Sequence, residues 1–81
     1  MTIKELKEEI IETIIDSTET DVDVTEETHI VNEMGLSSVE TMMMVSDLED
    51  HFGITIPTAA LRDVRTVGDL SAIVIVALLE D

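Results

Sequence analysis

The sequence predicts an all-α fold, a small bundle of three main helices plus one short helical turn, with a long loop between the first and second helices. Apolar residues recur at helical spacing in the segments assigned to helices, and each of these segments begins with a Ser or Thr that is followed three residues later by an acid. Phe52 is the sole aromatic residue, so the core must consist of Ile, Val, Leu and Met. With 81 residues, we expect one domain spanning residues 1–81.

The first helix is expected to begin at Thr2, because Thr2-Ile3-Lys4-Glu5 fits a capping box. It should end near Asp16-Ser17. One face is apolar, through Ile3, Leu6, Ile10, Ile11, Ile14 and Ile15. Residues 17–32 are rich in Thr, Asp and Glu and predict the long loop, a feature that is uncommon in small domains and often functional. Its apolar residues, expected to anchor it to the core, are Val22, Val24, Ile30 and Val31.

The second helix is expected after a turn at Gly35, with Ser37 as its cap and Glu40 closing a capping box. Gly53 should end it, because glycine readily takes a left-handed backbone. The expected core-facing residues are Val39, Met42, Met44, Val45, Leu48 and Phe52, and the expected solvent-facing acids are Glu40, Asp47, Glu49 and Asp50.

The remaining chain predicts an extended link, one short turn and the last helix. Pro57 disfavours a helix at the residue before it, so residues 54–57 should be extended. Residues 58–61 are expected to form the short turn. Thr66 is a good cap with Asp69 in the first turn, and the helix should run to about Leu79. A buried strand is the alternative for the apolar run at residues 72–79.

The charge balance excludes several classes of function. The chain has 4 Lys and Arg against 19 Asp and Glu, which gives a formal net charge of -15. This charge argues against nucleic-acid binding and favours basic protein partners. The chain has no cysteine, which excludes disulfides and thiolate metal sites. A calcium loop starting at Asp21 would need Gly at its sixth position and Glu at its twelfth, where the chain has Glu26 and Asn32. We therefore expect no metal site.

Other features point to a protein without chemistry of its own. His29 and His51 are isolated from other candidate ligands and are expected to be surface or capping residues. The N-terminus lacks the pattern of a signal peptide, and the apolar run at residues 72–79 is too short for a membrane span, which favours a cytoplasmic protein. Neither a nucleophile–base pair nor a glycine-rich phosphate loop is present, so an enzyme is not expected.

Three motifs in order resemble the acyl carrier proteins over nearly the whole chain. They are Met34-Gly35-Leu36-Ser37-Ser38-Val39-Glu40-Thr41, then residues 48–57 from Leu48 to Pro57, then Thr66-Val67-Gly68-Asp69-Leu70. The resemblance implies a four-helix bundle and a 4′-phosphopantetheine arm, donated by coenzyme A and attached to Ser38. It implies a monomer that carries acyl intermediates as thioesters in fatty acid, polyketide or specialised lipid biosynthesis.

The resemblance also implies partners and their contact residues. The partners would be a phosphopantetheinyl transferase and ketoacyl synthase-type and acyltransferase enzymes with basic docking patches. The docking residues would be Glu40, Met43, Asp47, Glu49 and Asp50, and the residues lining an acyl cavity would be Met42, Met44, Val45, Leu48, Phe52, Ile56, Leu61 and Val67. Residues 58–61 are a candidate lid, and the last helix is compatible with tight packing, a wider cavity or a dimer face.

The chain departs from the family pattern beside the expected attachment site. Ser37 stands where the family has an aspartate before the modified serine, and that aspartate contributes to recognition by the transferase. Val39 replaces the usual Leu, and Met43 stands where many members carry an acid. The alternative interpretation is therefore an unmodified carrier-like protein that docks to basic partners without an arm.

Overall fold

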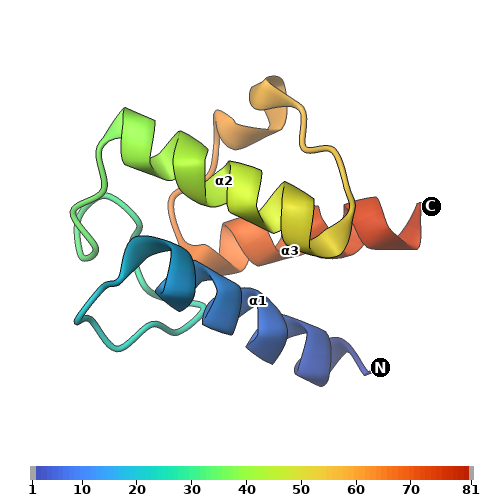
Figure 1. Ribbon diagram of the computed structural model, residues 1–81, viewed down its shortest axis with the longest axis horizontal. Helices are drawn as coiled ribbons and strands as arrows, with labels where there is room; N and C mark the ends of the chain where they lie inside the picture. Colours follow the sequence, from blue (N-terminus) through green and yellow to red (C-terminus); the bar gives the residue numbers. More distant parts are fainter. Residues whose placement is uncertain (1, 81) are drawn as a thin grey trace.

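The computed structural model describes residues 2–80 and confirms the all-α fold (Figure 1). The chain forms α1 (Ile3–Thr18), α2 (Ser38–Phe52), the short 3-10 turn η1 (Thr58–Leu61) and α3 (Val67–Leu79). α1 packs against both α2 and α3, whereas α2 and α3 approach each other less closely. The expectation of a four-helix bundle is wrong, because residues 2–80 contain three α-helices and η1 is a single turn with no buried residue. The alternative of a strand at residues 72–79 is also wrong, since α3 covers that run.

All three α-helices begin with the capping box that the sequence predicts. Thr2, Ser37 and Thr66 each accept a hydrogen bond from the backbone N–H three residues later, and the acid at that position accepts one from the cap's own N–H. Each box satisfies backbone donors that a helix start would otherwise leave unpaired. The start of each of these three α-helices is thus favoured by local sequence, before any packing is considered.

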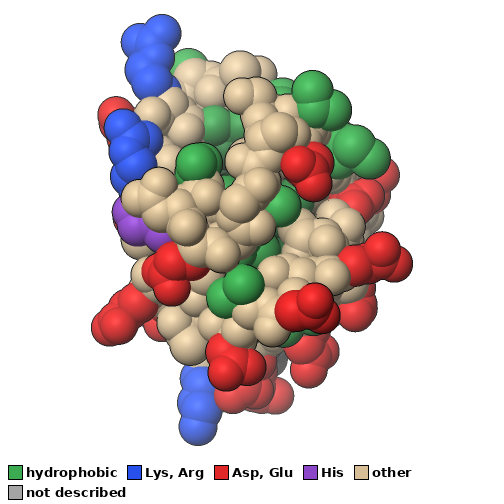
Figure 2. Space-filling view, turned by 90° about the vertical axis from the view of Figure 1, so that its left-hand side faces the viewer, with side chains coloured by type: hydrophobic (Ala, Val, Ile, Leu, Met, Phe, Trp, Pro, Cys, Tyr) green, Lys and Arg blue, Asp and Glu red, His purple; other side chains and the backbone are tan. Residues whose placement is uncertain are grey.

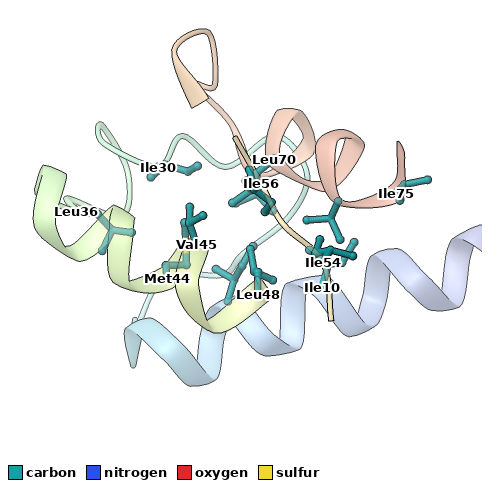
Figure 3. Close-up of a cluster of buried hydrophobic side chains, with 13 residues drawn as sticks. Ile10, Ile30, Leu36, Met44, Val45, Leu48, Ile54, Ile56, Leu70 and Ile75 are labelled. Carbon is teal, nitrogen blue, oxygen red and sulfur yellow. The ribbon is translucent and has the colours of Figure 1, made fainter. Parts of the chain in front are cut away.

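The core consists of hydrophobic, non-aromatic side chains from all three helices, the long loop and the extended link (Figure 3). Its buried members are Ile10, Ile14, Ile30, Leu36, Met44, Val45, Leu48, Ile54, Ile56, Val67, Leu70, Val74 and Ile75. Three predictions of buried positions are wrong, because Val31, Val39 and Met42 are exposed. The buried stripe of α2 is formed by Met44, Val45 and Leu48, and Val39 and Met42 lie outside it.

The long loop, residues 19–37, is held against the beginning of α3 by backbone hydrogen bonds. Ile30 N–H donates to the Arg65 carbonyl at 3.0 Å, and Val67 N–H donates to the Thr28 carbonyl at 2.9 Å. Gly68 N–H donates to the Glu26 carbonyl at 2.7 Å, and His29 forms an isolated bridge with Thr66. These bonds fix the loop that leads into the start of α2.

Candidate functional site

Ser38 is the first residue of α2 and is exposed to solvent. The segment before it is held in place, since Gly35 N–H donates to the Val31 carbonyl at 3.0 Å and Leu36 is buried in the core. Gly35 has φ of 67°, a left-handed backbone that glycine takes without strain. This turn, held by these two contacts, therefore places Ser38 at the surface.

Ser37 caps α2, which leaves the hydroxyl of Ser38 without a capping role. Ser37 Oγ accepts from Glu40 N–H at 3.2 Å, and Ser37 N–H donates to Glu40 Oε1 at 3.1 Å. Thr41 Oγ1 donates to the Ser37 carbonyl at 2.9 Å. Within residues 2–80, Ser38 Oγ makes no hydrogen bond, and so it is available to an enzyme that modifies hydroxyls.

The beginning of α2 is suited to hold a phosphate attached at Ser38. The first backbone N–H groups of a helix lack partners within the helix and carry the positive end of its dipole. Among the described residues, the N–H groups of Ser38 and Val39 have no acceptor. A phosphodiester on Ser38 would lie beside these donors, so the residues present fit the group.

Exposed hydrophobic side chains lie next to Ser38 on the outer surface of α2. A surface pocket is lined by Ser38, Val39, Met42, Met43, Ser46 and Asp47. Val39 is 69% exposed, Met42 47% and Met43 63%. Figure 2 looks onto the end of the molecule where α2 begins and shows hydrophobic side chains among acidic ones on this face. We call Val39, Met42 and Met43 the apolar strip. The sequence analysis assigned Val39 to the core and did not name it as a surface residue beside Ser38. Its spacing of three and four residues from Met42 and Met43 is the signal that places the three side chains on one side of the helix.

The acids predicted to dock partners are not equivalent in the structure. Glu40 belongs to the capping box, and Asp47 accepts a hydrogen bond from the hydroxyl of Ser17 in α1. Glu49 is half-buried, and its Oε2 accepts from Ile56 N–H at 2.7 Å, so the prediction that it simply faces solvent is wrong. Asp50 is exposed. The docking role of these acids and of Met43 stays a prediction.

The residues predicted to line an acyl cavity fall into two groups. Met44, Val45, Leu48, Ile56 and Val67 are buried together in the core, and Phe52 and Leu61 pack against it half-buried. Met42 lies outside this group, in the apolar strip. The cavity role of the set stays a prediction, and the structure separates Met42 from the rest.

The two histidines lie in different parts of the fold. His51, in the last turn of α2, pairs its Nε2 with Glu9 Oε1 at 2.9 Å and links α2 to α1. His29 is half-buried in the long loop. Residues 2–80 contain no group of three or more His, Asp or Glu placed to hold a metal ion. In the same part of the chain, the helices are too short or too polar to cross a membrane.

Comparison with known proteins gives consistent matches. Residues 8–74 match the family described as the phosphopantetheine attachment site. The chain is 34% identical over 70 residues to an acyl carrier protein of Lactobacillus acidophilus, covering 85% of this chain and 88% of that protein. It is 40% identical over 53 residues to a probable acyl carrier protein of Caulobacter vibrioides, covering 65% of this chain and 62% of that protein.

A solved structure is also similar. It is provisionally described as an acyl carrier protein from Mycobacterium tuberculosis, with a TM-score of 0.80 and 31% sequence identity. The match covers 88% of this chain and 96% of the other. The fold and the sequence therefore point to the same family.

Proposed function

We propose, from the premise that this chain belongs to the acyl carrier protein family, that Ser38 bears the 4′-phosphopantetheine arm and that acyl intermediates travel on it as thioesters. Members of this family are carriers and not enzymes, and phosphopantetheine is the cofactor of the matched region. We take residues 1–81 as one carrier domain, acting as a monomer in the cytoplasm.

The observation that carries the proposal is the division of roles between two adjacent serines. Ser37 is committed to the cap of α2, while Ser38 is exposed and its hydroxyl makes no hydrogen bond within residues 2–80. An attachment site needs a hydroxyl that a transferase can reach and a surrounding that tolerates a new negative charge. Ser38 is exposed, so a transferase can reach its hydroxyl. It also lies at the positive end of the α2 dipole, which favours a negative charge there.

The arm supplies a group that the protein itself lacks. The chain has no cysteine, and the arm ends in a thiol, on which acyl groups are held as thioesters. The role of the protein is to present that arm to separate enzymes: a phosphopantetheinyl transferase, then synthases and acyltransferases. Fatty acid, polyketide and specialised lipid biosynthesis are the pathways in which such a carrier would act.

We place the docking surface for these enzymes on the exposed side of α2. The apolar strip lies beside Ser38, and the acids at positions 40, 47, 49 and 50 belong to the same helix. Hydrophobic contact area supplies affinity, and the acids steer basic patches toward it. Since Glu40, Asp47 and Glu49 also make internal hydrogen bonds, Met43 and Asp50 are the best docking candidates.

The proposal is tested by the mass of the protein after co-expression with a promiscuous phosphopantetheinyl transferase. Wild-type protein is expected to gain one phosphopantetheinyl group, and Ser38→Ala is expected to gain none. Ser37→Ala is the matched control, because it removes the neighbouring hydroxyl and the cap but leaves Ser38, so it should still be modified.

Two results would contradict the proposal. A mass gain that persists in Ser38→Ala would place the arm elsewhere. The absence of any gain in wild-type protein would favour the alternative, a carrier-like protein that docks to basic partners without an arm.

A further inference from the structure

Ser71 is a buried polar residue on the otherwise aliphatic face of α3. Its exposed fraction is 0%, and the other buried residues of this helix are Val67, Leu70, Val74 and Ile75. The Ser71 hydroxyl has no hydrogen-bond partner among the described residues. A serine thus occupies a position where the surroundings favour an aliphatic side chain.

The lack of a partner distinguishes Ser71 from the half-buried hydroxyls of Thr13, Thr18 and Thr41 on the other helices. The hydroxyls of Thr13, Thr18 and Thr41 each donate to the backbone carbonyl four residues earlier, at 2.8 to 2.9 Å. A buried hydroxyl that lacks a partner destabilises the fold, a cost that alanine would avoid. The cost disappears when a ligand brings a hydrogen-bonding atom to Ser71.

The position of Ser71 links it to the expected path of the cargo. It lies one turn after Val67 on the same face of α3, and Val67 is among the residues predicted to line the acyl cavity. Met44 and Leu48 of α2 belong to the same buried cluster as Val67, Leu70 and Val74 of α3. Methionine adapts to irregular shapes, so the Met44 side chain can shift to admit an acyl chain beside α3.

We propose that Ser71 recognises an acyl chain that carries oxygen at carbon 3, by a hydrogen bond between its hydroxyl and the 3-hydroxyl or 3-keto oxygen. This inference rests on the proposed function and names the class of cargo. A saturated chain beyond the thioester offers no hydrogen-bonding atom and leaves Ser71 unsatisfied. Condensation of two acyl thioesters leaves a keto oxygen at carbon 3. Synthase partners that catalyse this condensation would therefore produce such chains.

The test compares two cargoes on the same protein. Octanoyl and 3-hydroxyoctanoyl groups are loaded onto the arm from the corresponding coenzyme A thioesters, and urea unfolding of each form is measured. For wild-type protein, the folding equilibrium constant of the 3-hydroxyoctanoyl form is expected to be about 5-fold higher than that of the octanoyl form. This ratio corresponds to the net contribution of one hydrogen bond to stability. Ser71→Ala should remove the difference and stabilise the unloaded protein. Ser46→Ala is the control, since Ser46 is exposed on α2, and it should keep the difference.

A second measurement keeps the test independent of the variants. The ¹³Cβ resonance of Ser71 in wild-type protein is expected to shift on loading with 3-hydroxyoctanoyl and much less with octanoyl. Equal stability of the two loaded wild-type forms, or a difference that persists in Ser71→Ala, would overturn the inference. Failure of the proposed function looks different, because Ser38 would then accept no arm and neither cargo could be loaded.

Discussion

At the scale of single residues, neighbouring side chains of similar chemistry perform different tasks. Ser37 closes the capping box with Glu40, and Ser38 presents its hydroxyl to solvent. On the same helix, Met44 is fully buried while Met43 is exposed. The first contrast arises because Ser37 is the extended cap outside the helix, and the second because successive helical residues point about 100° apart. A functional assignment in this protein therefore depends on the individual position and not on the residue type.

The aspartate that the family carries before its modified serine can be restored here without disturbing the helix. Ser and Asp are about equally good caps, so Ser37→Asp should change the free energy of unfolding by only a few tenths of a kcal/mol. If the aspartate helps the transferase to recognise its site, the rate of modification at Ser38 by a transferase that prefers the family pattern should rise. Time-resolved intact mass measures the rate, and Ser37→Asn, an equally good cap without charge, is the control. Equal rates for all three proteins would assign no role to this charge.

Glu49 joins α2 to the extended link as well as contributing charge. Its Oε2 accepts from Ile56 N–H at 2.7 Å, and Ile56 is buried. Glu49→Ala removes the acceptor and should destabilise the fold by about 1–3 kcal/mol, while Glu49→Gln keeps an acceptor and should cost less. Urea unfolding measures the cost, and hydrogen exchange at the Ile56 amide should accelerate in Glu49→Ala. Unchanged exchange there would show that the bond is not formed in solution.

At the scale of elements, the long loop and α3 are fitted to each other at Gly68. A Cβ built on this residue would lie 2.8 Å from the Glu26 carbonyl oxygen, a contact that forces a shift of the backbone. The same two residues form the 2.7 Å hydrogen bond that holds the loop. Glycine is a poor helix former, so its presence inside α3 is explained by this close approach.

Gly68→Ala is therefore expected to be destabilising, even though alanine favours helices by about 1 kcal/mol over glycine. Crowding in a well-packed site costs about 1–3 kcal/mol, and loss of the bond to Glu26 adds to that cost. Urea unfolding gives the net effect, and amide shifts in residues 26–30 report the displaced loop. Ser46→Ala, at an exposed helical position, should be neutral or slightly stabilising. A stabilised Gly68→Ala would mean that the loop does not approach α3 so closely.

The capping box of α3 makes the free energy of unfolding of the protein dependent on pH. The Asp69 carboxylate accepts from Arg65 N–H at 3.0 Å and from Thr66 N–H at 3.1 Å, and these bonds lower the pKa of Asp69 below its usual value. Because the pKa is lower in the folded state, protonation favours the unfolded state. The contribution of Asp69 is present above the ordinary aspartate range and is lost as the pH falls through the lowered folded pKa.

Asp69→Asn should therefore be less stable than wild-type protein at neutral pH and approach it at acid pH. Urea unfolding of both proteins between about pH 7 and pH 2, a range that spans the usual aspartate pKa, measures the difference. Asp63→Asn is the control, since Asp63 is exposed outside the capping box. A difference between Asp69→Asn and wild type that is constant with pH would rule out this linkage.

At the scale of the whole molecule, the features that sequence predicted are those with local causes. The caps at Thr2, Ser37 and Thr66 were predictable because each depends on residues three apart. The exposure of Val39 was not, because burial on α2 depends on how α1 and the extended link cover it. The position of Ser38 followed from its motif, whereas the unpaired hydroxyl of Ser71 emerges only when the core is assembled.

The net charge of -15 also acts on the molecule as a whole. Acids are spread over its surface, as Figure 2 shows for the end where α2 begins. Within residues 2–80, Lys7 forms an ion pair with Glu26, and His51 Nε2 contacts Glu9 Oε1. One face of α1 gathers Glu5, Glu8, Glu9, Glu12 and Asp16 beside His51. Like charges held close together repel more in the compact fold than in the unfolded chain, so this net charge destabilises the fold.

Salt should relieve this repulsion and stabilise the protein. The Debye length falls from about 30 Å at 0.01 M to about 10 Å at 0.1 M, which screens most exposed pairs. The midpoint of urea unfolding should rise over this range, and the rise should be smaller in Glu8→Gln/Glu12→Gln, which removes two exposed charges of the α1 face. The same salt should slow association with a basic partner, because steering weakens with ionic strength. A midpoint that falls with salt in both proteins would mean that attraction between opposite charges, such as Lys7 and Glu26, outweighs the repulsion.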